Sequence, residues 1–298
     1  MILFRYDAAL LERYPDIIGG VILARGLANG PTPPALLAAY QAEQTAALQR
    51  IGETPLSDLP SLAAWRRAFS AFGVKPTQYR SAAEALLRRL TKQGGIPNVN
   101  LLVDLGNLVS IRYALPVAIF DRRDAAGTVT VRFAAGDERF TDLGTDEVEN
   151  PAAGEVIFVD EMGLVSARRW CWRQSAQSAA SDSTTEALIT VEAHHAGGED
   201  DVRAALADLL GTFVYALLML LFSERLVSLN LRYAPVVLSL LGFLLLWGVS
   251  VLVQLPNPWL DTLLRAGLLA AYLVFVYAII DRGTILKKLM AAVRQAAG

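Results

Sequence analysis

The sequence has very little cysteine and histidine: one cysteine, Cys171, and two histidines, His194 and His195. A single cysteine forms no intramolecular disulfide, which excludes a small secreted domain held together by disulfides. The two histidines are adjacent, so their side chains would point to opposite faces of a strand, and the Cys/His spacing of zinc sites is absent. We therefore expect no metal site and no cofactor, and a reducing compartment is the simplest fit.

The chain also lacks an excess of charge of one sign. Its formal net charge is −2 at pH 7, from 27 Lys and Arg against 29 Asp and Glu. Proteins that bind nucleic acid through their overall charge are strongly basic, so nucleic-acid binding here requires a local basic surface. No charged segment leads into an apolar one at the amino terminus, so we expect no signal peptide.

Apolar residues, in contrast, are abundant and unevenly distributed. They make up 54% of the chain, and the mean hydropathy is +0.38, above the usual range of globular proteins. Residues 1–203 carry 20 Lys and Arg against 25 Asp and Glu, as in an ordinary, slightly acidic domain. Because the apolar excess begins after about residue 208, the sequence predicts a soluble domain over residues 1–212 and a membrane tail over residues 213–298.

The predicted tail contains three uncharged segments. Residues 233–253 are 21 in number, enough to span a bilayer, and residues 266–280 span it if the flanking charged side chains reach the interface. Residues 209–222 form either a short third span or an interfacial helix. The tail is thus an all-α membrane hairpin or a three-helix tail. It resembles the last helices of an oligosaccharide (polysaccharide) flippase, which adds membrane transport, in a chimeric chain, as an alternative function.

The soluble domain alternates between predicted strands and helices. Apolar periodicity and turn signals predict strands over residues 17–27, 117–120, 128–133, 155–160, 164–167 and 186–195. They predict helices over residues 33–50, 61–72, 81–92, 99–111 and 199–213. Residues 170–173 read as a strand with two indoles on one face, and residues 174–185 are typical of a mobile loop. The strands pair without regular βαβ repeats, so the predicted fold class is α+β with a mixed sheet.

The predicted helix over residues 99–111 carries one polar row on an otherwise apolar surface. Asn100, Asp104 and Asn107 lie at positions i, i+4 and i+7, and therefore on one stripe. Such a row either faces solvent and bonds nearby backbone or lines a pocket. The helix leads directly into the predicted strand over residues 117–120, which favours a pocket lined by these side chains.

Several motifs of the soluble domain follow one another in the order of a known family. They are Trp65-Arg-Arg-Ala-Phe69, Asn100-x-x-Val103-Asp104-x-x-Asn107, Leu115-Pro116, Phe120-Asp121, Trp170-Cys-Trp-Arg-Gln174, and Thr184-Thr185 ahead of Val191-Glu192. Residues 15–212 thereby resemble the B3/B4 domain of the phenylalanyl-tRNA synthetase beta chain, and more closely its freestanding relatives. The resemblance implies tRNA or aminoacyl-tRNA as partner, and it does not extend to a complete phenylalanine-tRNA ligase.

In the synthetase this domain hydrolyses tRNA that carries the wrong amino acid, so the resemblance implies an editing pocket. Glu192 fits the position of the family glutamate that selects the side chain or orients water, and it is the expected catalytic residue. The expected substrate-binding residues are Asn100, Asp104, Asn107, Trp172 and Arg173. Ala118 and Gly106 stand where the family has a histidine and a threonine. A non-catalytic module that binds tRNA or an amino acid therefore remains open beside the deacylase.

The helices over residues 61–72 and 81–92 supply a local basic surface, in which Glu84 is the sole acid. The expected tRNA-binding residues are Arg66, Arg67, Lys75, Arg80, Arg88 and Arg89. The alternative is an ordinary solvated helix face.

Basic residues near the uncharged segments predict their orientation. They gather at Arg225 and Arg232 and again at Arg282, Lys287, Lys288 and Arg294. The positive-inside rule places both groups in the cytoplasm. Two spans, with residues 209–222 at the interface, then keep the soluble domain beside tRNA, whereas three spans would put it outside. We expect the inner (cytoplasmic) membrane, with the soluble domain facing the cytoplasm.

Overall fold

The structure is a computed structural model that describes residues 3–211, 261, 264–270 and 272. The chain divides into two compact units, Met1–Leu220 and Leu221–Gly298. In the second unit the described residues are helical, and Arg265 pairs with Asp261. The predicted span over residues 233–253 lies outside the described residues, as does most of residues 209–222 and 266–280. None of the helices described is long and apolar enough to cross a membrane.

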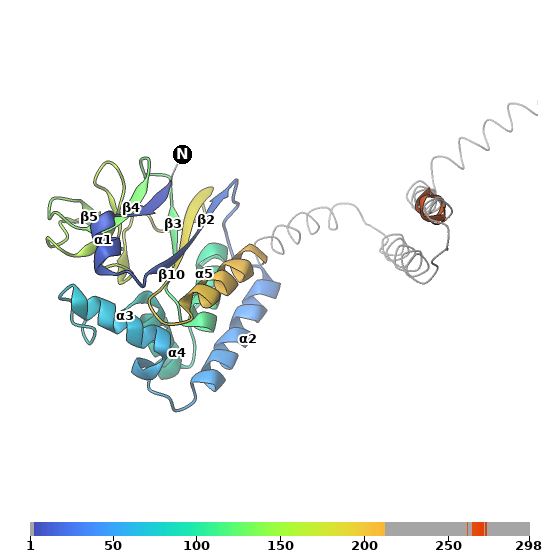
Figure 1. The fold of residues 1–298 in the computed structure, drawn as a ribbon, viewed down its shortest axis with the longest axis horizontal. Coiled ribbons are helices and arrows are strands. Elements are labelled where there is room, and N and C mark those ends of the chain that lie inside the picture. The colour runs from blue at the N-terminus through green and yellow to red at the C-terminus, as the bar shows by residue number, and fades with distance from the viewer. Residues whose placement is uncertain (1–2, 212–260, 262–263, 271, 273–298) are drawn as a thin grey trace, which may run out of the picture. The chain divides into compact units, whose positions relative to one another are not determined.

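The first unit contains two main sheets (Figure 1). A three-stranded antiparallel sheet has the order β2-β10-β3, formed by Ile18–Arg25, Glu186–Ala193 and Val117–Asp121. A five-stranded sheet has the order β1-β4-β7-β8-β9, formed by Phe4–Tyr6, Val129–Phe133, Val156–Val159, Val165–Arg168 and Arg173–Gln174. Strand β1 runs parallel to β4, and the other pairs are antiparallel. A short hairpin pairs β5 (Phe140–Thr141) with β6 (Val148–Glu149).

The helices of this unit begin at residues that suit helix starts. They are α1 (Ala8–Arg13), α2 (Pro34–Ile51), the 3₁₀ helix η1 (Leu56–Asp58), α3 (Pro60–Ala71), α4 (Ala82–Gln93) and α5 (Leu101–Tyr113). Asn100 caps α5 by accepting from the Val103 backbone N–H at 3.0 Å, and Ser81 caps α4 in the same way. One more helix runs from residue 198 to residue 211. The mixed-sheet α+β class predicted for the soluble domain is confirmed.

Strand β10 is buried on both faces and separates two apolar cores. On one face Ile189 and Val191 pack with residues of α2, α4, α5 and the helix over residues 198–211. On the other face Leu188 packs with residues of the five-stranded sheet. Because side chains alternate along a strand, Glu192 lies on the same face as Leu188. Glu192 and helix α5 are therefore on opposite faces of the three-stranded sheet.

Several short elements and one turn differ from the sequence prediction. Strand β1 and helix α1, of 3 and 6 residues, are too short for apolar periodicity to reveal them. The strand predicted over residues 170–173 is wrong, because residues 169–172 form a turn in which Arg169 and Trp170 have φ values of 44° and 61°. Trp170 is fully buried and Trp172 is half-buried, so the two indoles do not share a face.

Candidate functional site

A pocket of about 80 Å³ opens between the two sheets, next to the carboxyl end of β10. Its walls come from β3, β7, β8 and β10, the turn over residues 169–172 and the first residue of α4. They are largely apolar and include Ala82, Val117, Ala118, Phe120, Phe158, Ala167 and Trp170. Two buried polar side chains of β10, Thr190 and Glu192, also line it. The pocket is thus a small apolar cavity with one buried carboxyl group.

Both hydrogen bonds to the Glu192 carboxyl group reach the same oxygen. Only 2% of Glu192 is exposed, and its Oε1 accepts hydrogen bonds from Tyr6 Oη at 2.7 Å and Trp170 Nε1 at 3.2 Å. Its other oxygen, Oε2, has no donor among the described residues. Burial raises the pKa of Glu192 to about 7, and the hydrogen bonds from Tyr6 and Trp170 oppose this rise. A carboxyl group with such a pKa can take up and release a proton near neutral pH.

The other ionisable groups near this carboxyl group are neutral at neutral pH. Burial raises the pKa of the Tyr6 hydroxyl, and the charge of Glu192 raises it further. The same two causes raise the pKa of the Cys171 thiol, which therefore is poorly suited to act as a nucleophile. Burial lowers the pKa of His194 to about 4, and its ring packs between the Trp65 and Trp170 indoles at 4.6 and 4.8 Å. Glu192 is thus the group suited to proton transfer here.

The rim of the pocket carries stacked aromatic and cationic side chains. The Arg169 guanidinium lies 4.1 Å from the Tyr79 ring and 4.6 Å from the Trp172 ring, and Arg173 lies 4.7 Å from the Trp172 ring. Arg173 also pairs with Asp142. Trp172 and Arg173 both line the pocket, so the structure brings these two predicted binding residues together with Glu192.

The three polar residues of the α5 row do not line this pocket. Asn100 caps its helix, and Asp104, with 0% exposed, accepts from Thr32 Oγ1 at 2.5 Å and from the Val99 backbone N–H at 2.9 Å. Asn107 is half-buried and is not among the residues that line the pocket. Because α5 packs on the opposite face of the sheet from Glu192, the row and the glutamate do not form the single cleft expected from the sequence.

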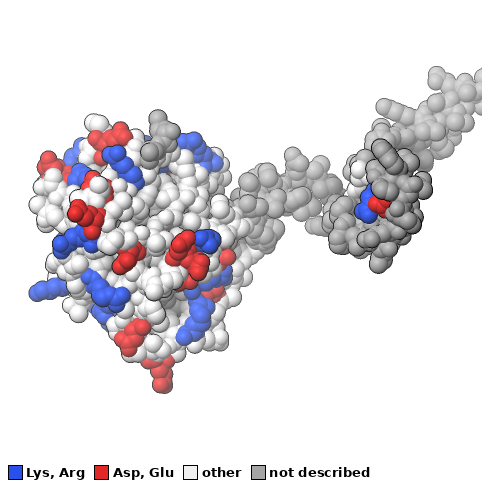
Figure 2. Space-filling model, viewed as in Figure 1, with Lys and Arg blue, Asp and Glu red and all other residues white. Residues whose placement is uncertain are grey.

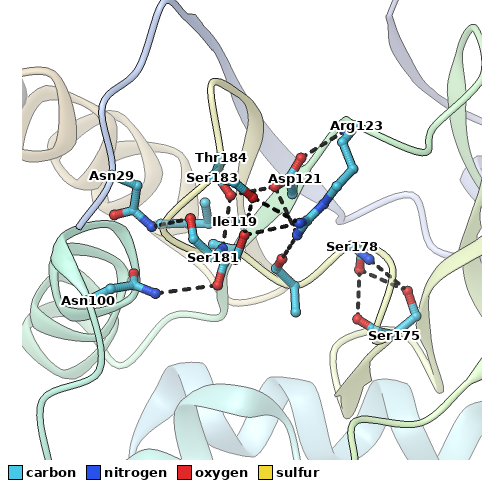
Figure 3. A network of polar contacts seen from close by, with 12 residues as sticks. Asn29, Asn100, Ile119, Asp121, Arg123, Ser175, Ser178, Ser181, Ser183 and Thr184 are labelled. Carbon is cyan, nitrogen blue, oxygen red and sulfur yellow. Dashed lines mark hydrogen bonds and ion pairs between the residues drawn. The ribbon is translucent and has the colours of Figure 1, made fainter. Parts of the chain in front are cut away.

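Asn100 instead helps to hold the loop that was predicted to be mobile (Figure 3). Its Nδ2 donates to the Ala180 carbonyl at 3.3 Å, and Asn29 Nδ2 donates to the Ser181 carbonyl at 2.8 Å. Arg123 pairs with Asp121 at 3.0 Å and donates to the Ala179 carbonyl at 2.7 Å. These bonds tie backbone carbonyls of the loop to α5, to Asn29 and to the residues at the end of β3.

The predicted basic surface is partly neutralised within the domain. Arg66 and Arg80 lie 3.3 and 3.6 Å from Glu84, a residue with 1% exposed. The side chains of Arg67, Lys75 and Arg89 are exposed. Arg66 and Arg88 line a recess of about 350 Å³ between α4 and residues 51–57. On the face shown in Figure 2, basic and acidic side chains are interspersed, so no extended surface of one sign forms there.

A larger recess, of about 590 Å³, lies on the helical side of the three-stranded sheet. Its charged groups already have partners: Arg112 pairs with Glu43 and Asp208 at 2.7 Å each, and His195 Nε2 lies 2.9 Å from Asp201 Oδ2. Its size exceeds that of the Glu192 pocket. However, the charged groups here are paired, and His195 Nδ1 is the buried side-chain atom left without a partner. Glu192 combines a raised pKa with an Oε2 that has no donor among the described residues, so we place the candidate site at Glu192.

Comparisons with known proteins give three similarities. Residues 64–197 match the family model of the B3/4 domain. A stretch of 116 residues is 28% identical to the phenylalanine–tRNA ligase beta subunit of Shewanella oneidensis and covers 39% of this chain but 14% of that protein. An N-terminal fragment of the phenylalanyl-tRNA synthetase beta subunit from Pyrococcus horikoshii aligns with a TM-score of 0.39 at 13% identity, over 72% of this chain and 48% of that one.

The B3/4 match contains some of the pocket and excludes the rest of the chain. Glu192, Trp170, Trp172 and Arg173 lie inside residues 64–197, whereas Tyr6 does not. The match ends before residue 213, so it gives no support to the flippase resemblance of the tail.

Sequence reasoning missed Tyr6, which donates to Glu192, and most of the pocket lining, including Thr190 and Cys171. No local signal marked Tyr6, because its strand of 3 residues is too short for apolar alternation to be recognised. Thr190 lies two residues before Glu192 and so shares its face of β10. No local signal marks Cys171, which enters the pocket through the turn over residues 169–172.

Proposed function

We propose that the B3/4 domain binds aminoacyl-tRNA and hydrolyses its ester bond, with Glu192 as the catalytic residue. The observation that carries this proposal is the buried carboxyl group, with a pKa of about 7 and one oxygen without a donor among the described residues, in an apolar pocket. The similarity of the domain to part of a tRNA ligase subunit supports tRNA as the partner.

The chemistry requires one proton transfer that Glu192 is suited to make. Its carboxylate takes a proton from a water molecule as the water oxygen attacks the ester carbonyl carbon. The bond between that carbon and the ribose oxygen breaks, and the ribose oxygen receives the proton. The products are a free amino acid and uncharged tRNA. At the rim, the guanidiniums of Arg169 and Arg173 lie over the Trp172 ring and suit a phosphate group.

The second candidate is a module of the same specificity that binds without turnover. Ala118 lines the pocket where the family resemblance leads us to expect a histidine, so the pocket has one proton-transfer side chain rather than two. Gly106, the other departure, packs against Ile119 on the helical side of the sheet and is not a pocket residue. Hydrolysis that needs two proton-transfer side chains would not occur in a pocket with Glu192 alone. Such a pocket would bind aminoacyl-tRNA without turnover.

The exposed basic residues Arg67, Lys75 and Arg89 provide the contact with the tRNA backbone in this proposal. Each is exposed on or beside α3 and α4. Arg66 and Arg80 contribute less, because Glu84 offsets their charge.

We also propose that the tail anchors this domain at the cytoplasmic face of the inner membrane, on the support of the sequence alone. Residues 233–253 and 266–280 are uncharged, and basic residues follow at Arg282, Lys287, Lys288 and Arg294. The test is fractionation of cells that express the full chain. Recovery in the membrane pellet after alkaline carbonate extraction supports anchoring, and recovery in the supernatant contradicts it.

The test of the main proposal is a deacylation panel with the full-length chain in mild detergent. Transfer RNAs charged with each amino acid are incubated with the protein, and release of the amino acid is followed. Release by the wild type that falls about 100-fold or more in Glu192→Gln supports hydrolysis. The matched control is Glu53→Gln, because Glu53 is exposed and distant from the pocket lining. Binding of charged tRNA without release supports the non-catalytic module instead.

A further inference from the structure

The two donors to Glu192 come from different parts of the chain. Trp170 belongs to the B3/4 match, whereas Tyr6 lies on β1, ahead of that match. Strand β1 runs parallel to β4 at the edge of the five-stranded sheet, with Tyr6 opposite Val131. This pairing places the Tyr6 hydroxyl between the two sheets, where it reaches Glu192 Oε1 at 2.7 Å.

The opposing strand is shaped for the Tyr6 ring. Gly19 of β2 lies directly across from Glu192 in the β2–β10 pair. A Cβ atom at residue 19 would be 2.1 Å from Tyr6 Oη and 2.8 Å from two carbon atoms of its ring. The phenol therefore occupies the space that any larger residue at position 19 would fill, and glycine is needed for the hydroxyl to reach the carboxyl group.

The second donor, Trp170, lies in a turn with an uncommon backbone conformation. Trp170 and the preceding Arg169 both have positive φ values, 61° and 44°, which cost energy in residues other than glycine. The Trp170 backbone N–H donates to the Val156 carbonyl at 2.6 Å, and its indole is fully buried. This turn directs the indole Nε1–H to the same oxygen, Oε1, that Tyr6 contacts.

We infer that Tyr6 and Trp170 are positioning residues that bind Oε1 of Glu192 together, so that Oε2 alone faces the pocket and exchanges the proton. The geometry requires that a strand outside the B3/4 match complete the site. The inference deepens the function proposed above, and it rests on that function for the role of Oε2 in catalysis. The arrangement of the carboxyl group itself is measurable without any substrate.

The other charged and titratable groups around Glu192 are neutral or paired. The hydrogen bonds from Tyr6 and Trp170 therefore set how far its pKa rises. Cys171 faces it from the turn, and Tyr6 from β1; both have raised pKa values and stay neutral. His194, which follows β10 and contacts the Trp170 indole, has its pKa lowered to about 4 and is also neutral. Arg173 at the rim is paired with Asp142. Removal of a hydrogen bond from the carboxylate should therefore raise the pKa of Glu192.

The principal test is Tyr6→Phe, which keeps the ring and removes the hydroxyl. The titration of Glu192 is followed in the full-length chain by carbon NMR of labelled glutamate carboxyl groups, and its signal is assigned by its loss in Glu192→Gln. We expect the midpoint to rise by about one pH unit, the size of one hydrogen bond to a charged group. The matched control is Tyr113→Phe, which removes a tyrosine–carboxylate bond to Asp208 on the helical side. An unchanged midpoint in Tyr6→Phe would overturn the inference.

A second variant reaches the same contact by another route. In Gly19→Ala the added Cβ displaces the Tyr6 ring, so the midpoint should move in the same direction as in Tyr6→Phe. In the double variant of Gly19→Ala and Tyr6→Phe the two shifts should not add, because both remove one hydrogen bond. Additive shifts would contradict a shared cause.

The catalytic part is tested by the pH profile of deacylation, whose acid limb should move upward with the NMR midpoint. If Tyr6→Phe shifts the midpoint and no charged tRNA is hydrolysed by the wild type, the positioning of Oε1 holds and the proposed hydrolysis fails. If the wild type hydrolyses charged tRNA and Tyr6→Phe changes neither the midpoint nor the acid limb, the proposed function holds and the positioning fails.

Discussion

Buried carboxylates on the two faces of the three-stranded sheet differ in how completely they are hydrogen-bonded. On the helical face Asp104 has donors to both oxygens, from Thr32 and Val99. On the other face Glu192 has two donors to one oxygen, and no described residue donates to the second. A buried polar group whose bonds are complete stabilises structure, whereas an incomplete one is available to a ligand. The comparison separates a carboxylate whose hydrogen bonds are complete from one with an oxygen that no described residue contacts as a donor, although both occur in motifs of the B3/4 resemblance.

The largest expected contrast is in activity. Glu192→Gln should lower deacylation by about 100-fold or more, because the amide does not accept a proton from water. Asp104→Asn should change the rate per folded molecule by less than about threefold, because Asp104 is not in the pocket. Single-turnover rates for the two variants make the test, and a loss in Asp104→Asn equal to that in Glu192→Gln would remove the distinction between the faces.

Stability should show the reverse order. Asp104→Ala removes the acceptor for the Thr32 hydroxyl and the Val99 N–H, and we expect a loss of about 3 kcal/mol in the free energy of unfolding. Amide hydrogen exchange of β10 peptides in the full chain measures it. Glu53→Ala is the control, because Glu53 is exposed. A loss no larger than in this control would show that the α5 row does not stabilise the fold.

The free energy of unfolding should depend on the protonation of Glu192 near neutral pH. Its pKa rises from 4.5 to about 7 on folding, so the folded state binds more protons between these values. Its contribution is therefore full below pH 4.5 and is lost as pH rises through 7, by about 3 kcal/mol. Relative to the wild type, Glu192→Gln should gain this amount between pH 5 and 8 in urea unfolding. Parallel curves would contradict the raised pKa.

His194 should change the free energy of unfolding with pH in the opposite direction to Glu192. Its pKa falls from 6.5 to about 4, so its contribution is full above pH 6.5 and is lost as pH falls through 4. The two residues oppose each other between pH 4.5 and 6.5. The wild-type curve should therefore be flatter in this window than that of Glu192→Gln.

Adjacent glycines allow a finer comparison of the two faces. A Cβ at Gly20 would lie 2.4 Å from Leu206 on the helical side, whereas one at Gly19 would meet Tyr6 on the pocket side. Gly20→Ala should cost about 1–3 kcal/mol of stability and leave the Glu192 titration unchanged. Gly19→Ala should move that titration. Unfolding and carbon NMR on both variants test the assignment, and a titration shift in Gly20→Ala would contradict it.

The smallest expected effect concerns the basic surface. Arg67→Ala should weaken tRNA binding modestly and lower the slope of log affinity against log salt by about one, as for loss of one phosphate contact. Arg203→Ala, also exposed, is the control because its side chain pairs with Glu199 and Asp200. Binding isotherms at several salt concentrations measure the slope, and equal slopes would remove Arg67 from the interface.

Much of the fold was predictable because its long elements carry strong local signals. The α5 helix has its cap at Asn100, and β10 has an apolar run ending near Glu192, so both were predicted within a few residues. The turn over residues 169–172 was not, because its positive φ values at Arg169 and Trp170 run against the local preference of both residues. Strand β1 is too short to be predicted from its own sequence, and it forms by pairing with β4.

The sequence by itself determined the α+β class, because that class depends on residue type and local periodicity. Its motifs carried the B3/4 resemblance, and the resemblance led to Glu192 as the candidate residue. Only the tertiary structure decided which residues share a pocket with Glu192. Sheet pairing sets that choice: alternation along β10 turns Glu192 away from α5 and toward the Tyr6 hydroxyl and Trp170 indole. Residues far apart in the chain meet there through strand register, which no local pattern encodes.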